Sequence, residues 1–281
     1  MTSRTHVVLA LIFVLAALIV LSSIVAYGTN FDDPLTRNLK KIYPAIIVRD
    51  RVISVFDLEK AIEIGVSLDK SAEPKTIRDQ LIKQKKMEIL VRKLRIGYGS
   101  QNVTNEFLFT KAGKNVEYLT LITDHFSGHE KLFEKFVVTS ETLDALLRIR
   151  YNSDFSQNSV AYNRIMVIQR QLQEGESFED LAKEKSADQL TGQFGGDLGF
   201  FNESEIVPEL ASKITVASLG EVLDQIVVSR FGYHLLYPVE TAEVGGQKVW
   251  QAKHILVETE GYDDWLESQI ENLPVWTIFT I

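Results

Sequence analysis

Two histidines lie in the middle of two apolar segments near the end of the chain, and imidazole is the side chain that most readily exchanges a proton near neutral pH. His234 is in FGYHLLYPV and His254 is in VWQAKHILV. Between the segments, Gly245 and Gly246 supply the positive φ values that a tight turn needs. The spacing predicts a β-hairpin with the two imidazoles directly opposite each other on one face, and a bulge would shift this pairing by one residue.

Paired imidazoles have three common roles: half of a metal site, an acid–base pair, or a hydrogen-bonded structural network. The metal role is disfavoured because no further ligands have a recognisable spacing and the chain contains no cysteine. His125 and His129, four residues apart, resemble a second metal pair, but Gly128 interrupts that helix. The sequence therefore predicts no bound metal and no cofactor.

These histidines follow a long region with helical periodicity and a shorter region of mixed pattern. Apolar residues recur at helical spacing from Phe56 to Leu68, from Lys75 to Leu94, and from Leu143 to Tyr151. Two helices, three strand-like segments and a short helix follow, and the short connections indicate an antiparallel sheet. The fold class is therefore predicted as α+β, with a helical domain preceding a four-stranded sheet.

Composition limits the function classes. The chain has 281 residues, and its formal net charge of −8 makes nucleic acid an unexpected partner. Val7 to Ala26 carries no charge and is long enough to cross the roughly 30 Å hydrocarbon core of a bilayer. A cleaved signal peptide has an apolar region of about 7–15 residues, so an uncleaved anchor is expected. The flanking charges do not decide the orientation of this anchor.

Four segments after Ser159 resemble a parvulin-type peptidyl-prolyl isomerase domain in order and spacing. They are GESFEDLAKEKSAD, GGDLGFFNESEIVPEL, ASLGEVLDQIV and SRFGYHLLYPVE. Parvulins open with a strand of the type A-[RK]-H-I-L-V, but here AKHILV, Ala252 to Val257, comes last. In the family, the opening strand lies antiparallel to the final strand, which is the relation that the predicted hairpin creates. The domain therefore resembles a circularly permuted parvulin.

The resemblance implies roles for eight residues. His254 and His234 match the two family histidines, Asp188 matches a position held by cysteine or aspartate, and Ser229 matches a hydroxyl position; these four form the implied catalytic set. The implied proline pocket consists of Leu198, Ile206, Leu210 and Phe200. Ile206 stands where methionine is usual and Leu210 where phenylalanine is usual, so the pocket has lost the family's aromatic residue at position 210. Each apolar residue could equally be ordinary core.

The helical half resembles the N-terminal chaperone domain of SurA-like and PrsA-like foldases, through DRVISVFDLEKA and VTNEFL. This resemblance implies an extracytoplasmic, single-pass membrane protein. Its expected activity is isomerisation of X–Pro bonds, and its expected partners are unfolded, proline-containing polypeptides. A non-catalytic chaperone that keeps the fold as a binding surface is the alternative, and a scaffold for one folded partner is a third interpretation.

The expected domain organisation has five parts. They are a transmembrane anchor at 1–28, a linker at 29–43, a helical chaperone-like domain at 44–154, a permuted parvulin-like domain at 155–260, and a C-terminal helix and edge strand at 261–281 packed on the parvulin-like domain. Deletion from Val249 onward is expected to unfold the parvulin-like domain, because it removes a central strand.

Overall fold

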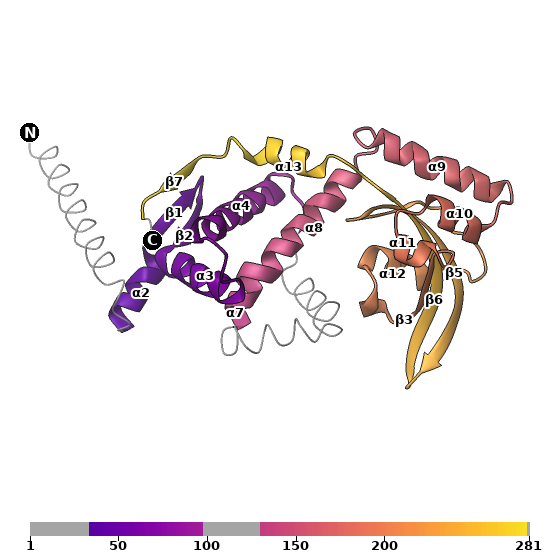
Figure 1. Ribbon diagram of the computed structural model, residues 1–281, viewed down its shortest axis with the longest axis horizontal. Helices are drawn as coiled ribbons and strands as arrows, with labels where there is room; N and C mark the ends of the chain where they lie inside the picture. The colour runs from indigo at the N-terminus through magenta and orange to yellow at the C-terminus, as the bar shows by residue number, and fades with distance from the viewer. Residues whose placement is uncertain (1–33, 98–129, 280–281) are drawn as a thin grey trace, which may run out of the picture. The chain divides into compact units, whose positions relative to one another are not determined.

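The computed structural model describes residues 34–97 and 130–279 (Figure 1). The chain divides into two compact units, Met1–Ile89 with Asn272–Ile281, and Leu90–Glu271. The predicted anchor, the VTNEFL motif and the His125–His129 pair lie outside the described residues. Within 34–97 and 130–279, no helix has the length and apolar character needed to cross a bilayer.

The first unit contains a small antiparallel sheet in the order β2-β1-β7. Its strands are β1 (Pro44–Val48), β2 (Arg51–Ser54) and β7 (Val275–Thr277), and its helices include α2 (Pro34–Ile42) and α3 (Val55–Leu68). Ser54 ends β2 and caps α3, because its hydroxyl accepts a hydrogen bond from the backbone N–H of Asp57 at 3.1 Å. Helix α4 (Pro74–Lys93) then carries the chain from the first unit into the second.

Three predictions about this part of the chain are corrected. The predicted linker 29–43 contains α2, whose Lys40 is buried and forms an ion pair with Glu59 at 2.9 Å. The predicted helical domain begins with the β1–β2 hairpin, because Ile46, Val48 and Ile53 are buried in a sheet. The C-terminal edge strand β7 pairs with β1 in the first unit and not with the parvulin-like sheet.

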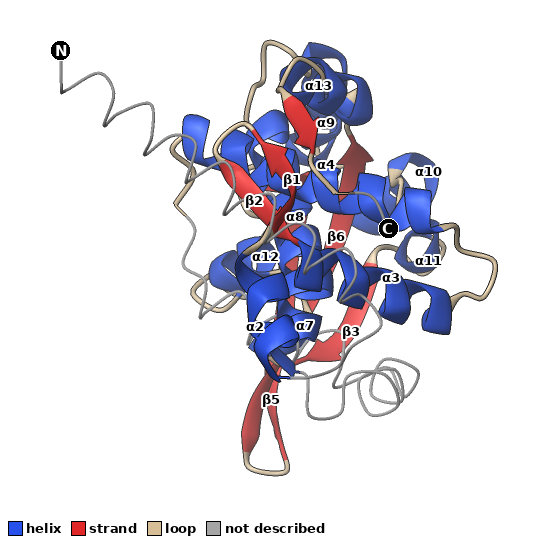
Figure 2. Ribbon diagram, turned by 90° about the vertical axis from the view of Figure 1, so that its left-hand side faces the viewer, coloured by secondary structure: helices blue, strands red, loops and turns tan. Residues whose placement is uncertain are grey.

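The second unit is built around a four-stranded antiparallel sheet in the order β3-β6-β5-β4. Its strands are β3 (Asp197–Phe201), β4 (Val227–Ser229), β5 (Gly232–Val244) and β6 (Gln247–Glu258). The two long strands, β5 and β6, form a hairpin whose far end is exposed and projects from the sheet (Figure 2). The predicted hairpin is therefore present, and its second strand lies at the centre of the sheet.

The sheet is covered on both faces, so the central strands are buried on alternate sides (Figure 1). One face carries Tyr233, Leu235 and Ile255 and packs against α9 (Ser159–Gln173) and α10 (Phe178–Lys185). The other face carries Leu236 and Ala252 and packs against α12 (Pro208–Ile214). His234 and His254 alternate with the first set, so they lie on the α12 face.

Among the described residues of this unit, the remaining helices are short except for α8. They are α7 (Glu130–Phe133), the π-helical turn η3 (Glu134–Val138), α8 (Thr139–Asn152), α11 (Gln189–Gly192), the 3₁₀ turn η4 (Glu203–Glu205) and α13 (Tyr262–Ile270). Helix α13 packs on α8, where Tyr262 donates a hydrogen bond to the Asp144 carboxylate at 2.9 Å. The predicted domain boundary at 154 is thus corrected, because α8 belongs with the four-stranded sheet.

Candidate active site

The β5–β6 hairpin brings the two histidines together, but not in the predicted register. Its turn is Gly245–Gly246, with φ angles of 58° and 78°, and it is closed by the pairing of Val244 with Gln247. A bulge at Pro238/Glu240 then shifts the pairing, so His234 lies opposite Leu256 and His254 lies opposite Leu236. The prediction that the histidines are directly opposite is therefore wrong, because the turn is centred after position 244.

A diagonal pairing still places both imidazoles on one face, since they are separated by two residues across the ladder. The ring centroids are 5.5 Å apart with an interplanar angle of 18°, so the rings are stacked. The two Nδ1 atoms are 3.3 Å apart, which is hydrogen-bonding distance. The histidines are buried, with 2% and 5% of their surfaces exposed.

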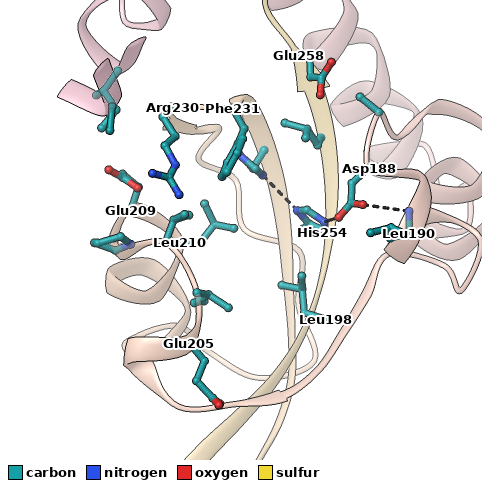
Figure 3. A pocket seen from close by; sticks show the side chains of 18 of the residues that line it. Asp188, Leu190, Leu198, Glu205, Glu209, Leu210, Arg230, Phe231, His254 and Glu258 are labelled. Atoms are coloured by element: carbon teal, nitrogen blue, oxygen red, sulfur yellow. Dashed lines mark hydrogen bonds and ion pairs between the residues drawn. The ribbon is translucent and has the colours of Figure 1, made fainter. Parts of the chain in front are cut away.

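A hydrogen-bonded chain runs through this pair from Asp188 to Ser229 (Figure 3 shows its Asp188–His254 end). The Oδ2 atom of Asp188 lies 2.9 Å from Nε2 of His254, and the hydroxyl of Ser229 lies 2.7 Å from Nε2 of His234. An ionised carboxylate only accepts, so His254 carries its proton on Nε2 and accepts at Nδ1. His234 then donates from Nδ1, and its Nε2 accepts from Ser229. Every position in the chain is satisfied with both imidazoles neutral.

The pKa directions agree with this assignment. Burial, together with the charge of a protonated His254, lowers the pKa of His234 to about 3, although Asp188 opposes the shift. Burial also lowers the pKa of His254, although the hydrogen bond and charge of Asp188 partly offset it. Burial alone would raise the pKa of Asp188, but hydrogen bonds from Thr191 and His254 hold it below its usual value. The site therefore contains one carboxylate and two neutral imidazoles at neutral pH.

Asp188 is held in place because it caps α11. Its Oδ1 accepts the backbone N–H groups of Leu190 and Thr191 at 3.1 and 3.4 Å, while the Thr191 hydroxyl donates to Oδ2 at 2.8 Å. The same hydroxyl lies 3.0 Å from Nε2 of His254. Sequence reasoning missed Thr191, although its position three residues after an N-cap aspartate was a signal for such a contact.

The loop after α11 is tied to the strand that carries His254. Gly196 has a φ of 82° and its carbonyl accepts the backbone N–H of His254 at 2.9 Å. A Cβ atom at Gly196 would lie 2.2 Å from the carbonyl oxygen of His254, so only glycine allows this approach. The glycines of the GGDLGFF motif therefore fix β3 beside β6.

The histidines face a cavity of about 940 Å³. His234, His254 and Asp188 line it together with three of the predicted pocket residues, Leu198, Ile206 and Leu210 (Figure 3 labels Leu198 and Leu210). Ser229 is fully buried and does not line the cavity, so it orients His234 from behind. The structure thus brings together every predicted site residue except Phe200.

Phe200 is 51% exposed and is absent from the cavity lining. The β3 strand has a bulge between Asp197 and Phe200, with Gly199 at a φ of 67°, and this bulge reverses the alternation of side chains. Phe201 consequently joins Leu198 in the core beside Leu210, while Phe200 points away. The prediction that Phe200 contributes to the proline pocket is wrong for this reason.

The cavity also has residues that the sequence did not indicate. Helix α8 forms one wall of the cavity, and the segment between β4 and β5 contributes Arg230 and Phe231. Phe231 is 46% exposed and supplies an aromatic ring to the cavity, although not at the family position, which Leu210 occupies. No group of three or more possible metal ligands occurs among residues 34–97 and 130–279.

Comparison with known proteins agrees with this geometry. Residues 146–240 match the family model described as Rotamase: PPIC-type PPIASE domain. The chain contains a PPIC-type PPIase domain. This is the parvulin family, as the motifs predicted, and the match ends before β6, which carries His254.

The relatives are foldases and chaperones. The chain is 38% identical over 74 residues to Foldase protein PrsA 2 of Bacillus anthracis, which covers 26% of each protein. It is 28% identical over 136 residues to Foldase protein PrsA of Oceanobacillus iheyensis, covering 43% of this chain and 45% of that protein. It is 34% identical over 121 residues to Chaperone SurA of Aromatoleum aromaticum, covering 41% and 27%. The matches therefore span less than half of each of these relatives.

Proposed function

We propose that the protein is a foldase that isomerises X–Pro peptide bonds in unfolded polypeptides. The observation that carries the proposal is the open cavity, which Leu198 lines together with His234 and His254. A filled cavity would leave no place for a proline ring. The PPIC-type domain and the foldase relatives support the same activity.

The reaction needs binding and polarity but no covalent step. Rotation about a peptide bond faces a barrier of about 18–20 kcal/mol, which arises from amide resonance. The apolar side chains of Leu198, Ile206 and Leu210 can grip the proline ring. The imidazoles and Asp188 then form the polar floor beside the amide, where they can favour the twisted, less conjugated state over the planar one.

The test is a cis–trans isomerisation assay with a proline-containing peptide. Uncatalysed exchange takes tens to hundreds of seconds at 25 °C, so added protein should shorten it. We expect His254→Ala to reduce kcat/KM by roughly 10- to 100-fold, because it breaks the chain that orients His234. A folded wild-type protein that leaves the peptide's exchange rate unchanged would refute the catalytic proposal.

We also propose that the PPIC-type domain is circularly permuted. Three observations support this: the family match ends at residue 240, AKHILV resembles the opening strand of a parvulin, and β6 lies between β3 and β5. On this proposal β6 supplies the first strand of the domain from the C-terminal side. A membrane anchor at Val7–Ala26 with extracytoplasmic domains completes the proposal, and protease protection in membrane vesicles tests its orientation.

The alternative is a non-catalytic chaperone, and Leu210 is the observation that favours it. Leu210 is 4% exposed and stands where parvulins usually have phenylalanine, so the grip on the proline ring is weaker. Leu210→Phe should create activity if this substitution has silenced the site. No change in an already active protein would show that the pocket works with leucine.

A further inference from the structure

Helix α8 presents one of its faces to the cavity. The lining residues Glu141, Ala145 and Ile149 are four apart, and Leu146 lies beside them on the same side of the helix. Ala145, Leu146 and Ile149 are apolar and only half-buried, so part of each side chain remains accessible. The neighbouring Leu143 and Leu147 are 2% and 0% exposed and belong to the core. The helix therefore has one face for stability and another that is open to the cavity.

This helix is tied to the histidine pair through a buried residue. Asn152, at the end of α8, is 1% exposed and donates a hydrogen bond to the carbonyl of Ser229 at 2.8 Å. Its own carbonyl accepts the Tyr233 hydroxyl at 2.8 Å, and its Oδ1 accepts the Thr259 hydroxyl at 2.6 Å. Ser229 in turn holds His234. One residue thus links the position of the α8 wall to the position of the imidazoles.

The size of the cavity calls for an occupant larger than a proline ring. Its volume of about 940 Å³ is near the upper end of the roughly 300–1,000 Å³ typical of sites that enclose drug-sized ligands. The three proline-pocket residues come from β3, the loop after η4, and α12, whereas the α8 face is a separate wall. In an extended client, neighbouring side chains point in opposite directions. The residue beside the proline is therefore directed toward another wall.

We infer that the open face of α8, formed by Ala145, Leu146 and Ile149, is a second subsite that binds an apolar side chain adjacent to the client's proline. This inference rests on the proposed function and names its preferred substrate class. An acidic neighbour does not suit the site, because the cavity lining contains Asp188 and four glutamates against a single arginine, Arg230. The preferred client is an extended segment in which leucine or a similar residue flanks proline.

The experiment uses the full chain and proline peptides that carry alanine, leucine or glutamate immediately before or after the proline. Both kcat/KM for isomerisation and the peptide Kd are measured. We expect the leucine peptide to have a kcat/KM roughly five- to tenfold higher than the alanine peptide on one side of the proline. This ratio corresponds to removing most of one leucine side chain from water. Glutamate should be the poorest of the three.

Two α8 variants test the assignment. The double variant Leu146→Ala with Ile149→Ala keeps good helix formers, and the leucine-to-alanine ratio should fall to within about twofold. Ala145→Phe fills the wall and should remove the leucine advantage by crowding. The matched control is Val167→Ala on α9, which is 53% exposed and outside the cavity; it should leave activity and ratio unchanged.

The two readouts separate the subsite from the isomerase activity. A wild-type protein that binds leucine peptides more tightly than alanine peptides without accelerating isomerisation would defeat the proposed activity and leave the α8 subsite standing. Equal affinity for both peptides in the wild type, or a leucine advantage that survives in both α8 variants, would overturn the subsite.

Discussion

Replacement of Asp188 by asparagine should reverse the direction of the hydrogen-bonded chain. Asparagine is also a good N-cap, so its carbonyl can replace Oδ1 toward the backbone N–H groups of Leu190 and Thr191. Its amide group then takes the place of Oδ2 and becomes a donor toward His254. The partly buried Thr191 hydroxyl, which donates to Oδ2 in the wild type, must turn to another acceptor. His254 must accept at Nε2 and move its proton to Nδ1, which forces His234 to accept at Nδ1 and donate from Nε2.

This reversal leaves one fully buried group, the Ser229 hydroxyl, unsatisfied. Ser229 already accepts the backbone N–H of Phe231 at 3.0 Å, and it would now accept from His234 as well. Its own hydroxyl proton would have lost its acceptor in a fully buried position. An unsatisfied buried donor costs about 1–3 kcal/mol. The two backbone hydrogen bonds to Oδ1 also become weaker when a neutral amide oxygen replaces the carboxylate, which costs about 1 kcal/mol more. Asp188→Asn should therefore lower the free energy of unfolding by roughly 2–4 kcal/mol.

Denaturant unfolding and ¹⁵N chemical shifts of the histidine side chains measure the two effects. The wild type should show protonated Nε2 on His254 and protonated Nδ1 on His234, and the variant should show the opposite tautomers. The matched control is Asp180→Asn, where an aspartate whose side chain is 79% exposed loses the same charge. Its cost should not exceed about 0.5 kcal/mol. Unchanged tautomers together with a loss below 1 kcal/mol in Asp188→Asn would refute the chain of donors and acceptors.

Three further predictions concern stability. Gly196→Ala should lower the free energy of unfolding in denaturant by about 3–5 kcal/mol, because Gly196 has a φ of 82° and lies against the His254 carbonyl. Gly246→Ala is the control: with a φ of 78° and open space around it, it should lower that free energy by about 1 kcal/mol. Equal losses in the two variants would contradict the close approach at Gly196. Acidification from pH 6.5 to about pH 3 should lower the free energy of unfolding by up to about 1.4 kcal/mol per pH unit, because His234 binds a proton in the unfolded chain at a higher pH than in the folded one. Thermal melts at several pH values measure this effect, and a melting temperature that does not change over this range would contradict it. Truncation after Glu271 removes β7 and should reduce hydrogen-exchange protection in β1 alone. Truncation after Lys248 removes most of β6 and should abolish protection throughout the four-stranded sheet. Survival of that sheet without β6 would contradict the central position of β6.

The main elements of the second unit could be predicted from the sequence because local and periodic signals agree there. Ser177 caps α10 as its position before Glu179 and Asp180 indicated. The paired glycines at 245 and 246 form the hairpin turn, and the two histidines lie on one face. The site residues follow from these elements, since the side-chain period of a strand fixes which residues face the cavity.

The errors in register have a different cause. Bulges at Pro238/Glu240 and at Asp197/Phe200 insert residues that alternation cannot reveal. The turn is centred between Gly245 and Gly246 and not at position 244, so the histidines are not directly opposite. The first bulge moves the partner of His234 from Val257 to Leu256, which keeps both histidines on one face, and the second exchanges the roles of Phe200 and Phe201. Gly199 was visible as a glycine inside a strand, which is a typical signal of a bulge.

The pairing of β7 with β1 could not be predicted, because it joins segments more than 200 residues apart. The three residues of β7 are mostly exposed, so they carry no periodic burial pattern. The assignment of α8 to the second unit was hidden for a related reason. The buried Leu143 and Leu147 show that α8 is packed but not against which element, and no pattern in α8 itself distinguishes Asn152, which contacts Ser229, from a solvated asparagine.

Asn152 also holds together three segments of the site that lie far apart in the sequence. It binds the end of β4 through Ser229, β5 through Tyr233, and the segment after β6 through Thr259. These three contacts fix the strands that carry Ser229, His234 and His254 relative to one another at the end of the sheet opposite the hairpin turn. The turn at Gly245–Gly246 fixes the other end. Because both ends of the histidine-bearing strands are held, the 3.3 Å contact between the imidazoles depends on the pairing of the strands and not on their order in the sequence.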